Sequence, residues 1–179
     1  METDPVITLP MSEEDGISFE LIELFFFAYR DFVADPDSML AKLSYGRAHH
    51  RVLHFVNRNP GIPVANLLGI LKITKQSIAR VLKQLIEDDY IAQQTGATDR
   101  RQRLLFPTQK GRDLALELSL CQAKRIEDAL KTLPQGTKES SKAFLYAMIE
   151  PQDRPIVRHL NEGLETSSSY DPSYQNRHK

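Results

Sequence analysis

The 179-residue sequence has one cysteine, no tryptophan and no long apolar run. The single cysteine, Cys121, excludes an internal disulfide framework and fits a reducing cytoplasm, where we expect the protein to work. No stretch approaches the roughly 18 consecutive apolar residues of a membrane span, so we expect no membrane partner. The first residues, METDPVITLPMSEEDG, are acidic and lack the basic and apolar regions of a signal peptide.

The sequence also lacks the motifs of common catalytic sites. It has no glycine-rich phosphate loop, no nucleophile elbow and no HExxH motif. His49, His50 and His54 lie close together, but no acidic residue or cysteine follows near enough to complete a metal site. We therefore expect no enzyme activity, no cofactor and no metal. For these histidines we expect a packing role or a pH-sensitive contact.

Charge is nearly balanced in total but unevenly distributed along the chain, whose net charge is −1. Residues 1–40 hold ten acidic side chains and one basic, whereas residues 41–112 hold thirteen basic and four acidic. A central basic block is the electrostatic footprint of a protein that binds a polyanion. Charge alone leaves open a solvated basic surface without any partner.

Hydrophobic periodicity predicts a first helix over residues 17–34. Its apolar stripe consists of Ile17, Leu21, Leu24, Phe25, Ala28 and Phe32. Phe26, Phe27 and Tyr29 widen this stripe, so the helix needs burial on most sides, either against a second subunit or at the centre of a core. Asp35-Pro36-Asp37 is predicted to end the helix, because proline cannot donate the next hydrogen bond.

Further helices are predicted over residues 45–57, 63–71, 74–88, 109–133 and 137–148, with a last piece reaching about 163 after Pro151 and Pro155. Asn59-Pro60-Gly61 predicts a turn. In the helix that begins at Thr74, the inward stripe is Ile78, Val81, Leu82, Leu85 and Ile86. Its opposite face is polar and basic, so this helix and the one before it predict a helix-turn-helix.

Two strand-like segments, residues 91–95 and 103–106, follow this helix-turn-helix. They flank residues 96–101, a hairpin loop with a charged tip. This order of parts suits a helix inserted into a DNA major groove and a hairpin that reaches the backbone or minor groove.

Two motifs resemble the MarR family of bacterial winged helix-turn-helix regulators. One is Asp99-Arg100-Arg101-Gln102-Arg103 followed by Pro107-Thr108-Gln109-Lys110-Gly111, and the other is ITKQSIARVLKQLIEDDYI. The segments FFFAYRDF and YGRAHHR are similar to a PetP-like branch of the family, and the resemblance covers residues 17 to 150. Lys72 and Asp89 depart from the pattern, since glycine is common at both places, and Pro107 replaces an apolar residue.

The resemblance implies a mainly α fold with a small β-wing, in which a winged helix-turn-helix lobe joins a helical dimerisation region. It implies a homodimer that binds a pseudo-palindromic operator in double-stranded DNA. The expected parts are a flexible acidic arm (1–16), a dimerisation helix and connection (17–44), the DNA-binding lobe (45–108), C-terminal dimerisation helices (109–164) and a disordered tail (165–179).

Side-chain chemistry assigns roles on the recognition helix. Gln76, Ser77 and Arg80 are expected at base edges, because glutamine pairs with adenine and arginine with guanine. Lys75 and Lys83 are expected at phosphates. Thr74 is expected to cap the helix and donate to a phosphate.

On the wing, Arg101 is expected in the minor groove. Asp99 is expected to orient Arg101 through a charge-assisted hydrogen bond. Arg100 and Arg103 are expected to support the contact with the DNA backbone. An exposed residue of this set could also be a surface side chain without a measurable role.

The resemblance further implies a repressor that a small aromatic or anionic effector releases. Residues that could line an effector pocket are Phe27, Tyr45, Arg47, His50 and Arg51. The alternative is a winged-helix protein-interaction module without DNA binding, which has no need of three arginines on its wing. A small enzyme is a third reading, for which the sequence offers no convergent set of catalytic side chains.

Overall fold

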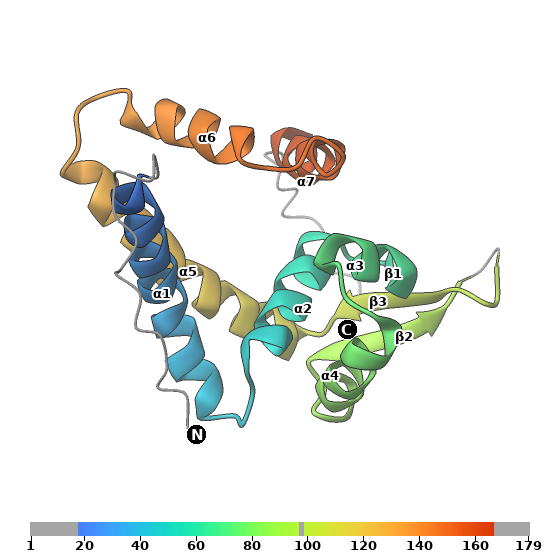
Figure 1. The fold of residues 1–179 in the computed structure, drawn as a ribbon. Coiled ribbons are helices and arrows are strands. Elements are labelled where there is room, and N and C mark those ends of the chain that lie inside the picture. The colour runs from blue at the N-terminus through green and yellow to red at the C-terminus, as the bar shows by residue number, and fades with distance from the viewer. Residues whose placement is uncertain (1–17, 97–98, 167–179) are drawn as a thin grey trace, which may run out of the picture.

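The computed structural model describes residues 18–96 and 99–166, and within them the chain folds into seven helices and three short strands (Figure 1). In chain order the elements are α1 (Phe19–Ala41), α2 (Arg47–Arg58), β1 (Ile62–Pro63), α3 (Val64–Leu71), α4 (Lys75–Glu87), β2 (Ile91–Thr95), β3 (Arg103–Pro107), α5 (Gln109–Lys131), α6 (Thr137–Ala147) and α7 (Arg154–Thr166). The predicted arm at 1–16 lies outside the described residues. So does the predicted tail, except that α7 extends two residues into it.

The three strands form one antiparallel sheet in the order β1-β3-β2. Leu105 at the centre of β3 pairs with Ile62 on one side and with Gln93 on the other. The predicted strands are confirmed as β2 and β3, whereas β1 was not predicted. The Gly61 N–H donates to the Leu105 carbonyl at 2.8 Å, so the turn at Asn59-Pro60-Gly61 leads directly into this third strand.

The winged lobe, which we define as α2, α3, α4 and the sheet (residues 47–107), is built around one core, to which α1 and α5 also contribute Leu40 and Leu118. Leu53, Leu67, Leu85 and Leu105 are fully buried in it. The predicted inward stripe of α4 is confirmed, with Ile86 half-buried and its other four members buried. Each helix of the lobe thus presents an apolar stripe to a shared interior.

Helices α1 and α5 leave this lobe together and pack side by side (Figure 1). The predicted end of the first helix at Asp35-Pro36-Asp37 is wrong, because α1 continues through Pro36 to Ala41. Proline leaves the carbonyl one turn earlier without its N–H partner. Here that carbonyl, on Phe32, accepts a hydrogen bond from the Gln122 side chain of α5 at 3.4 Å, and Pro36 itself is buried. Packing against α5 therefore keeps the helix continuous.

The C-terminal helices α6 and α7 lie across the opening between the α1–α5 pair and the lobe (Figure 1). Helix α6 has no buried residue. Helix α7 is tied to the lobe by an ion pair between Lys72 and Asp153 at 2.5 Å and by the Arg58 guanidinium, which donates to the Leu160 carbonyl at 2.8 Å. Pro155 does not interrupt α7 but lies in its first turn, where a missing N–H has no helical partner to lose.

Candidate nucleic-acid interface

The recognition helix α4 begins with the cap that the sequence predicts. The Thr74 hydroxyl oxygen accepts a hydrogen bond from the Ser77 N–H at 3.2 Å and lies 2.8 Å from the Ser77 hydroxyl. Lys72, in the turn before it, is left-handed with φ of 50°, which explains why glycine is favoured there. A lysine in this left-handed conformation is strained, because its Cβ crowds the backbone. The Thr74 cap then sets the residue at which α4 begins.

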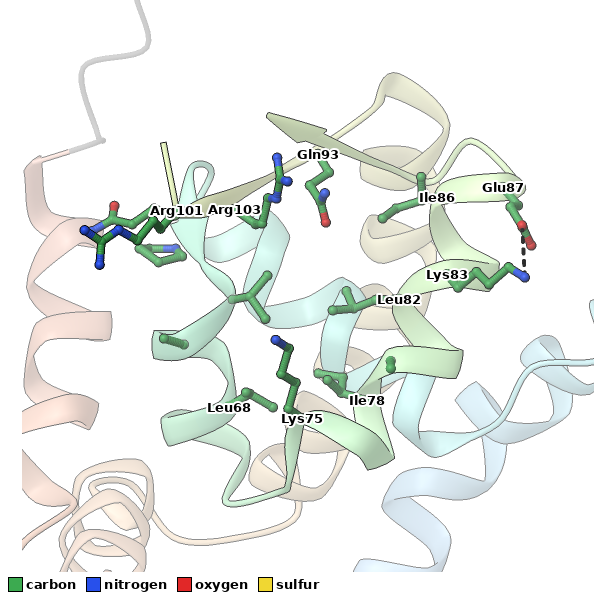
Figure 2. A pocket seen from close by; sticks show the side chains of 15 residues that line it. Leu68, Lys75, Ile78, Leu82, Lys83, Ile86, Glu87, Gln93, Arg101 and Arg103 are labelled. Atoms are coloured by element: carbon green, nitrogen blue, oxygen red, sulfur yellow. Dashed lines mark ion pairs between the residues drawn. The ribbon is translucent and has the colours of Figure 1, made fainter. Parts of the chain in front are cut away.

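The predicted DNA-contacting residues of α4 are all exposed but divide between two faces. Lys75 points into a groove between α4 and the wing, whereas Lys83 lies at its edge and extends toward Glu87, with which it pairs at 3.7 Å (Figure 2). Gln76, Ser77 and Arg80 are exposed outside the lining of that groove. The helix thus has lysines along the groove and a separate polar face beside them.

The wing is closed by backbone hydrogen bonds at the base of its loop. The Gly96 N–H donates to the Gln102 carbonyl at 3.1 Å, and the Gln102 N–H donates to the Asp99 carbonyl at 3.0 Å. The Asp99 carboxylate accepts the Arg101 backbone N–H at 2.9 Å. The structure therefore places Asp99 on the backbone of Arg101, where it shapes the turn, and shows no ion pair from it to the guanidinium among the described residues.

The wing arginines are exposed, and two of them border the groove. Arg101 and Arg103 line the groove together with Gln93 of β2 (Figure 2). Arg103 is held by its neighbouring strand, since its guanidinium donates to the Thr95 hydroxyl at 2.8 Å. Arg100 is exposed at the tip. Gln93, to which the sequence analysis assigns no role, is brought to this face by the alternation of side chains along β2.

The groove between α4 and the wing has a volume of about 660 Å³. Its floor is apolar, with Leu68, Ile78 and Leu82 at its centre (Figure 2). Its rim carries four cations, Lys75, Lys83, Arg101 and Arg103, against one carboxylate, Glu87. Two residues of this floor, Ile78 and Leu82, also belong to the hydrophobic core, so the groove is built on the packed interior of the lobe.

The segment Pro107–Gly111 couples the wing to α5. The Thr108 hydroxyl accepts the Gly111 N–H at 3.0 Å, which caps α5, and donates to the Asp89 carbonyl at 2.6 Å. A Cβ on Gly111 would lie 2.0 Å from the Tyr90 carbonyl oxygen, so no larger residue fits. Asp89 is left-handed with φ of 61°, as its place in the pattern predicts. These motif residues are structural and join the end of α4 to α5.

Three of the residues predicted for an effector pocket, Tyr45, Arg47 and Arg51, are bonded to other parts of the protein. Tyr45 belongs to the hydrophobic core, and its hydroxyl donates to Asp88 at 2.5 Å. Burial and this hydrogen bond raise the pKa of Tyr45. Arg47 pairs with Asp37 at 2.8 Å, and Arg51 donates to the Leu71 carbonyl at 3.1 Å. Tyr45 is therefore engaged within the core, and the effector pocket stays a prediction.

Of the other two, Phe27 is exposed on α1 beneath the Arg30 guanidinium. His50 is half-buried, and burial lowers its pKa, as it does for His54 one turn later. The histidines, cysteine and acidic side chains of the described residues form no group of three that could hold a metal ion. None of the helices in that part of the chain has the length and apolarity to cross a membrane.

Comparison with known proteins places the chain by sequence and by fold. The model of the MarR family matches residues 44–102, which include α2 to β2 of the lobe. The HTH-type transcriptional regulator PetP of Rhodobacter capsulatus is 44% identical over 141 residues, which cover 79% of this chain and 85% of that protein. The resemblance to the PetP-like branch is thereby confirmed.

Solved structures share the fold at lower identity. The transcriptional regulator SlyA has a TM-score of 0.62 at 21% identity, covering 80% of this chain and 98% of its own. FabT of Streptococcus pneumoniae, solved in complex with DNA, has a TM-score of 0.63 at 14% identity and covers 83% and 99%. A mainly helical fold with a small antiparallel sheet is thus confirmed. The chain belongs to the MarR family of transcriptional regulators.

Proposed function

We propose that the protein is a homodimer that binds a pseudo-palindromic site in double-stranded DNA. The observation that carries this proposal is the cationic rim of the groove, formed jointly by α4 and the wing on the packed interior of the lobe. Two structural neighbours, FabT and a MarR family regulator of Listeria monocytogenes, were solved with DNA. At 14% and 20% identity they support the fold and the mode of docking by analogy.

In the proposed complex the outer face of α4 enters the major groove and the wing lies beside it. Gln76, Ser77 and Arg80 meet base edges, with the Ser77 hydroxyl shared with the Thr74 cap. The rim of the groove meets phosphates through Lys75 and Lys83. Arg101 enters the minor groove, supported by Arg100 and Arg103, while Asp99 sets the turn that aims it.

The helical arms, which we define as α1, α5 and α6, support the proposed homodimer. Their exposed large apolar side chains are Leu21, Ile22, Leu24, Phe25, Phe26, Phe27, Tyr29, Leu116, Leu120, Ile126, Phe144 and Leu145. Soluble monomers rarely expose so continuous an apolar surface, whereas obligate dimers bury one. A two-fold dimer would also match the symmetry of a pseudo-palindromic site.

Repression, and its release by a small aromatic or anionic effector, stay predictions from the family resemblance. A second candidate function is a winged-helix module that binds protein and not DNA. The exposed wing arginines favour DNA, because neutralising phosphates is their most direct use.

The test is selection from random duplexes followed by sequencing, performed at two salt concentrations with wild type, Arg101→Ala and Lys138→Ala. Lys138 lies on α6 and serves as the charge control. We expect a palindromic motif whose binding weakens steeply with salt, is reduced by Arg101→Ala and is unchanged by Lys138→Ala. Absence of any enriched sequence, with no binding even at low salt, would contradict the proposal and favour the protein-interaction module.

A further inference from the structure

His49 on the first turn of α2 uses both of its ring nitrogens. Nδ1 accepts a hydrogen bond from the Gly46 N–H at 3.1 Å, so it carries no proton. Nε2 lies 3.1 Å from the Gln84 carboxamide oxygen on α4 and must then be the protonated nitrogen that donates to it. The geometry therefore fixes one neutral tautomer of His49.

The His49 ring is also held from its face. It stacks on Tyr45 with centroids 4.4 Å apart and planes at 3°. Tyr45 donates to Asp88, the residue that ends α4, and meets Tyr90 edge-on at 5.6 Å. One cluster at the start of α2 thus makes two polar links to the last turn and C-terminal end of α4.

This cluster holds α4 at the end opposite its proposed base contacts. Thr74 caps the first turn of α4, whereas Gln84 and Asp88 belong to its last turn and its end. A helix anchored at one end can still pivot, and a small change of angle moves the exposed side chains near Gln76 and Arg80. Binding energy at base edges depends on such placement, since hydrogen bonds weaken steeply with misalignment.

We propose that His49 is a positioning residue for the recognition helix, which it holds through Gln84 only as the neutral Nε2–H tautomer, so that acid weakens DNA binding. This inference rests on the proposed DNA-binding function. His49 itself lies outside the proposed contact set.

Protonation of His49 would place a proton on Nδ1, directly facing the Gly46 N–H. Two donors would then oppose each other, and the ring would have to turn or move, which breaks the alignment with Gln84. The titratable or charged groups that face the cluster are Tyr45, Asp88, Tyr90 and Lys110. Asp88 already accepts the Tyr45 hydroxyl, and Lys110 lies on the Tyr90 ring at 4.2 Å and donates to the Asp88 carbonyl at 2.8 Å.

The direction of the effect distinguishes this inference from ordinary electrostatics. Added positive charge on a DNA-binding protein strengthens its attraction to phosphates. A chain whose histidines only gain charge would therefore bind DNA more tightly in acid. A positioning role predicts the opposite, with an affinity loss of about three- to tenfold for one lost hydrogen bond.

The test measures the affinity for the selected operator by fluorescence anisotropy at pH 7.5 and 5.5 and constant ionic strength, with circular dichroism to establish that each sample is folded. His49→Gln keeps a donor toward Gln84 and does not titrate. Gln84→Ala removes the link. His50→Gln is the matched control, because it removes a neighbouring histidine of α2 that is half-buried.

We expect the wild-type and His50→Gln affinities to fall about three- to tenfold in acid, as for one hydrogen bond. The affinity of His49→Gln should not fall. Gln84→Ala should be weakened already at pH 7.5 and should show no further acid loss. Tighter or equal wild-type binding in acid, or an acid loss that persists in His49→Gln, would overturn the inference.

A second measurement does not depend on DNA. Long-range proton–nitrogen correlation spectra of the histidine rings at pH 7.5 report which nitrogen carries the proton. The inference predicts Nε2–H for His49, and a spectrum showing Nδ1–H would overturn it. A chain with the expected tautomer that binds no duplex at any pH would contradict the proposed function instead, so the two failures are distinguishable.

Discussion

The winged lobe buries its large apolar side chains, whereas the helical arms leave many of theirs exposed. In the lobe, Leu53, Leu67 and Leu85 have no exposed surface. In the arms, every residue from 21 to 30 of α1 is exposed, and Phe26 leaves 70% of its surface uncovered. The alternative of an ordinary core helix for α1 is thus wrong over this stretch, since only its C-terminal part is buried.

This difference shows which apolar side chains one chain can bury by itself and which it leaves exposed. Burial of a large apolar side chain stabilises a protein by about 1.5–3 kcal/mol, which the lobe obtains within the single chain. The exposed side chains of the arms can obtain it only against another surface, whereas Val33 and Leu118 of the same helices are already buried. The lobe should therefore respond to mutation in the same way at every chain concentration, and the arms should not.

The largest expected effect comes from placing a charge in the arms. Phe26→Glu would bury an unpaired carboxylate in the proposed dimer interface, so the chain should dissociate. Loss of two-site binding should weaken operator affinity by roughly 10²- to 10⁴-fold. Anisotropy titration measures this, with Phe26→Leu as the apolar control. Operator binding by Phe26→Glu at wild-type affinity would contradict a dimer interface on the arms.

A cavity-forming substitution can be made in the lobe and in the arms, and the two losses of stability compared. Leu85→Ala should lower the free energy of unfolding by roughly 2–5 kcal/mol, because it leaves a cavity in a packed core. Urea denaturation at several chain concentrations should give the same loss each time. Leu120→Ala, at a site 57% exposed in the single chain, is the matched change in the arms. Its loss should shrink on dilution, and a constant loss would argue that α5 is already covered.

A substitution at Thr108, which connects the wing to α5, should have a smaller effect on stability. Thr108→Ala removes the cap of α5 and the link to Asp89, and should destabilise the fold by about 0.5–2 kcal/mol. Thr132→Ala at the other end of α5 is the control, since its exposed hydroxyl only donates to the Ala129 carbonyl at 2.7 Å. Thermal unfolding compares the two variants. Equal losses would mean that the motif residue Thr108 has no special structural role.

Acid should produce the smallest effect on stability. Burial lowers the pKa of His50 and of His54 below the ordinary value of 6.5. The unfolded chain therefore binds protons that the folded chain does not, and stability is lost as the pH falls below about 6.5. Urea unfolding at pH 7.5 and 5.5 measures the loss, which His54→Gln should reduce, and His159→Gln at an exposed position of α7 is the control. An identical acid loss in both variants would contradict this assignment.

The sequence predicts the parts of the fold that depend on local pattern. The stripe from Ile78 to Ile86 defines α4, and Thr74 marks its start, because both signals lie within the helix itself. The turn at Asn59-Pro60-Gly61 and the two wing strands are likewise local. The position of Asp89 also follows from its own backbone requirement, since aspartate tolerates the left-handed region.

Long-range contacts account for what the sequence does not predict. Helix α1 continues through Pro36, and the Phe32 carbonyl left without its helical partner accepts a hydrogen bond from Gln122, 90 residues away. Strand β1 has only two residues and exists through its pairing with β3. Tyr45, which is predicted to line an effector pocket, donates a hydrogen bond to Asp88, 43 residues later. No window of sequence contains both members of these pairs.

The mass of the chain in solution decides whether the protein is the proposed homodimer. Sedimentation equilibrium at micromolar concentration, alone and with the selected operator, reports how many chains associate. We expect twice the mass of one chain without DNA and two chains on each duplex. A single-chain mass under both conditions, with the apolar face of α1 left in water, would contradict the proposed homodimer.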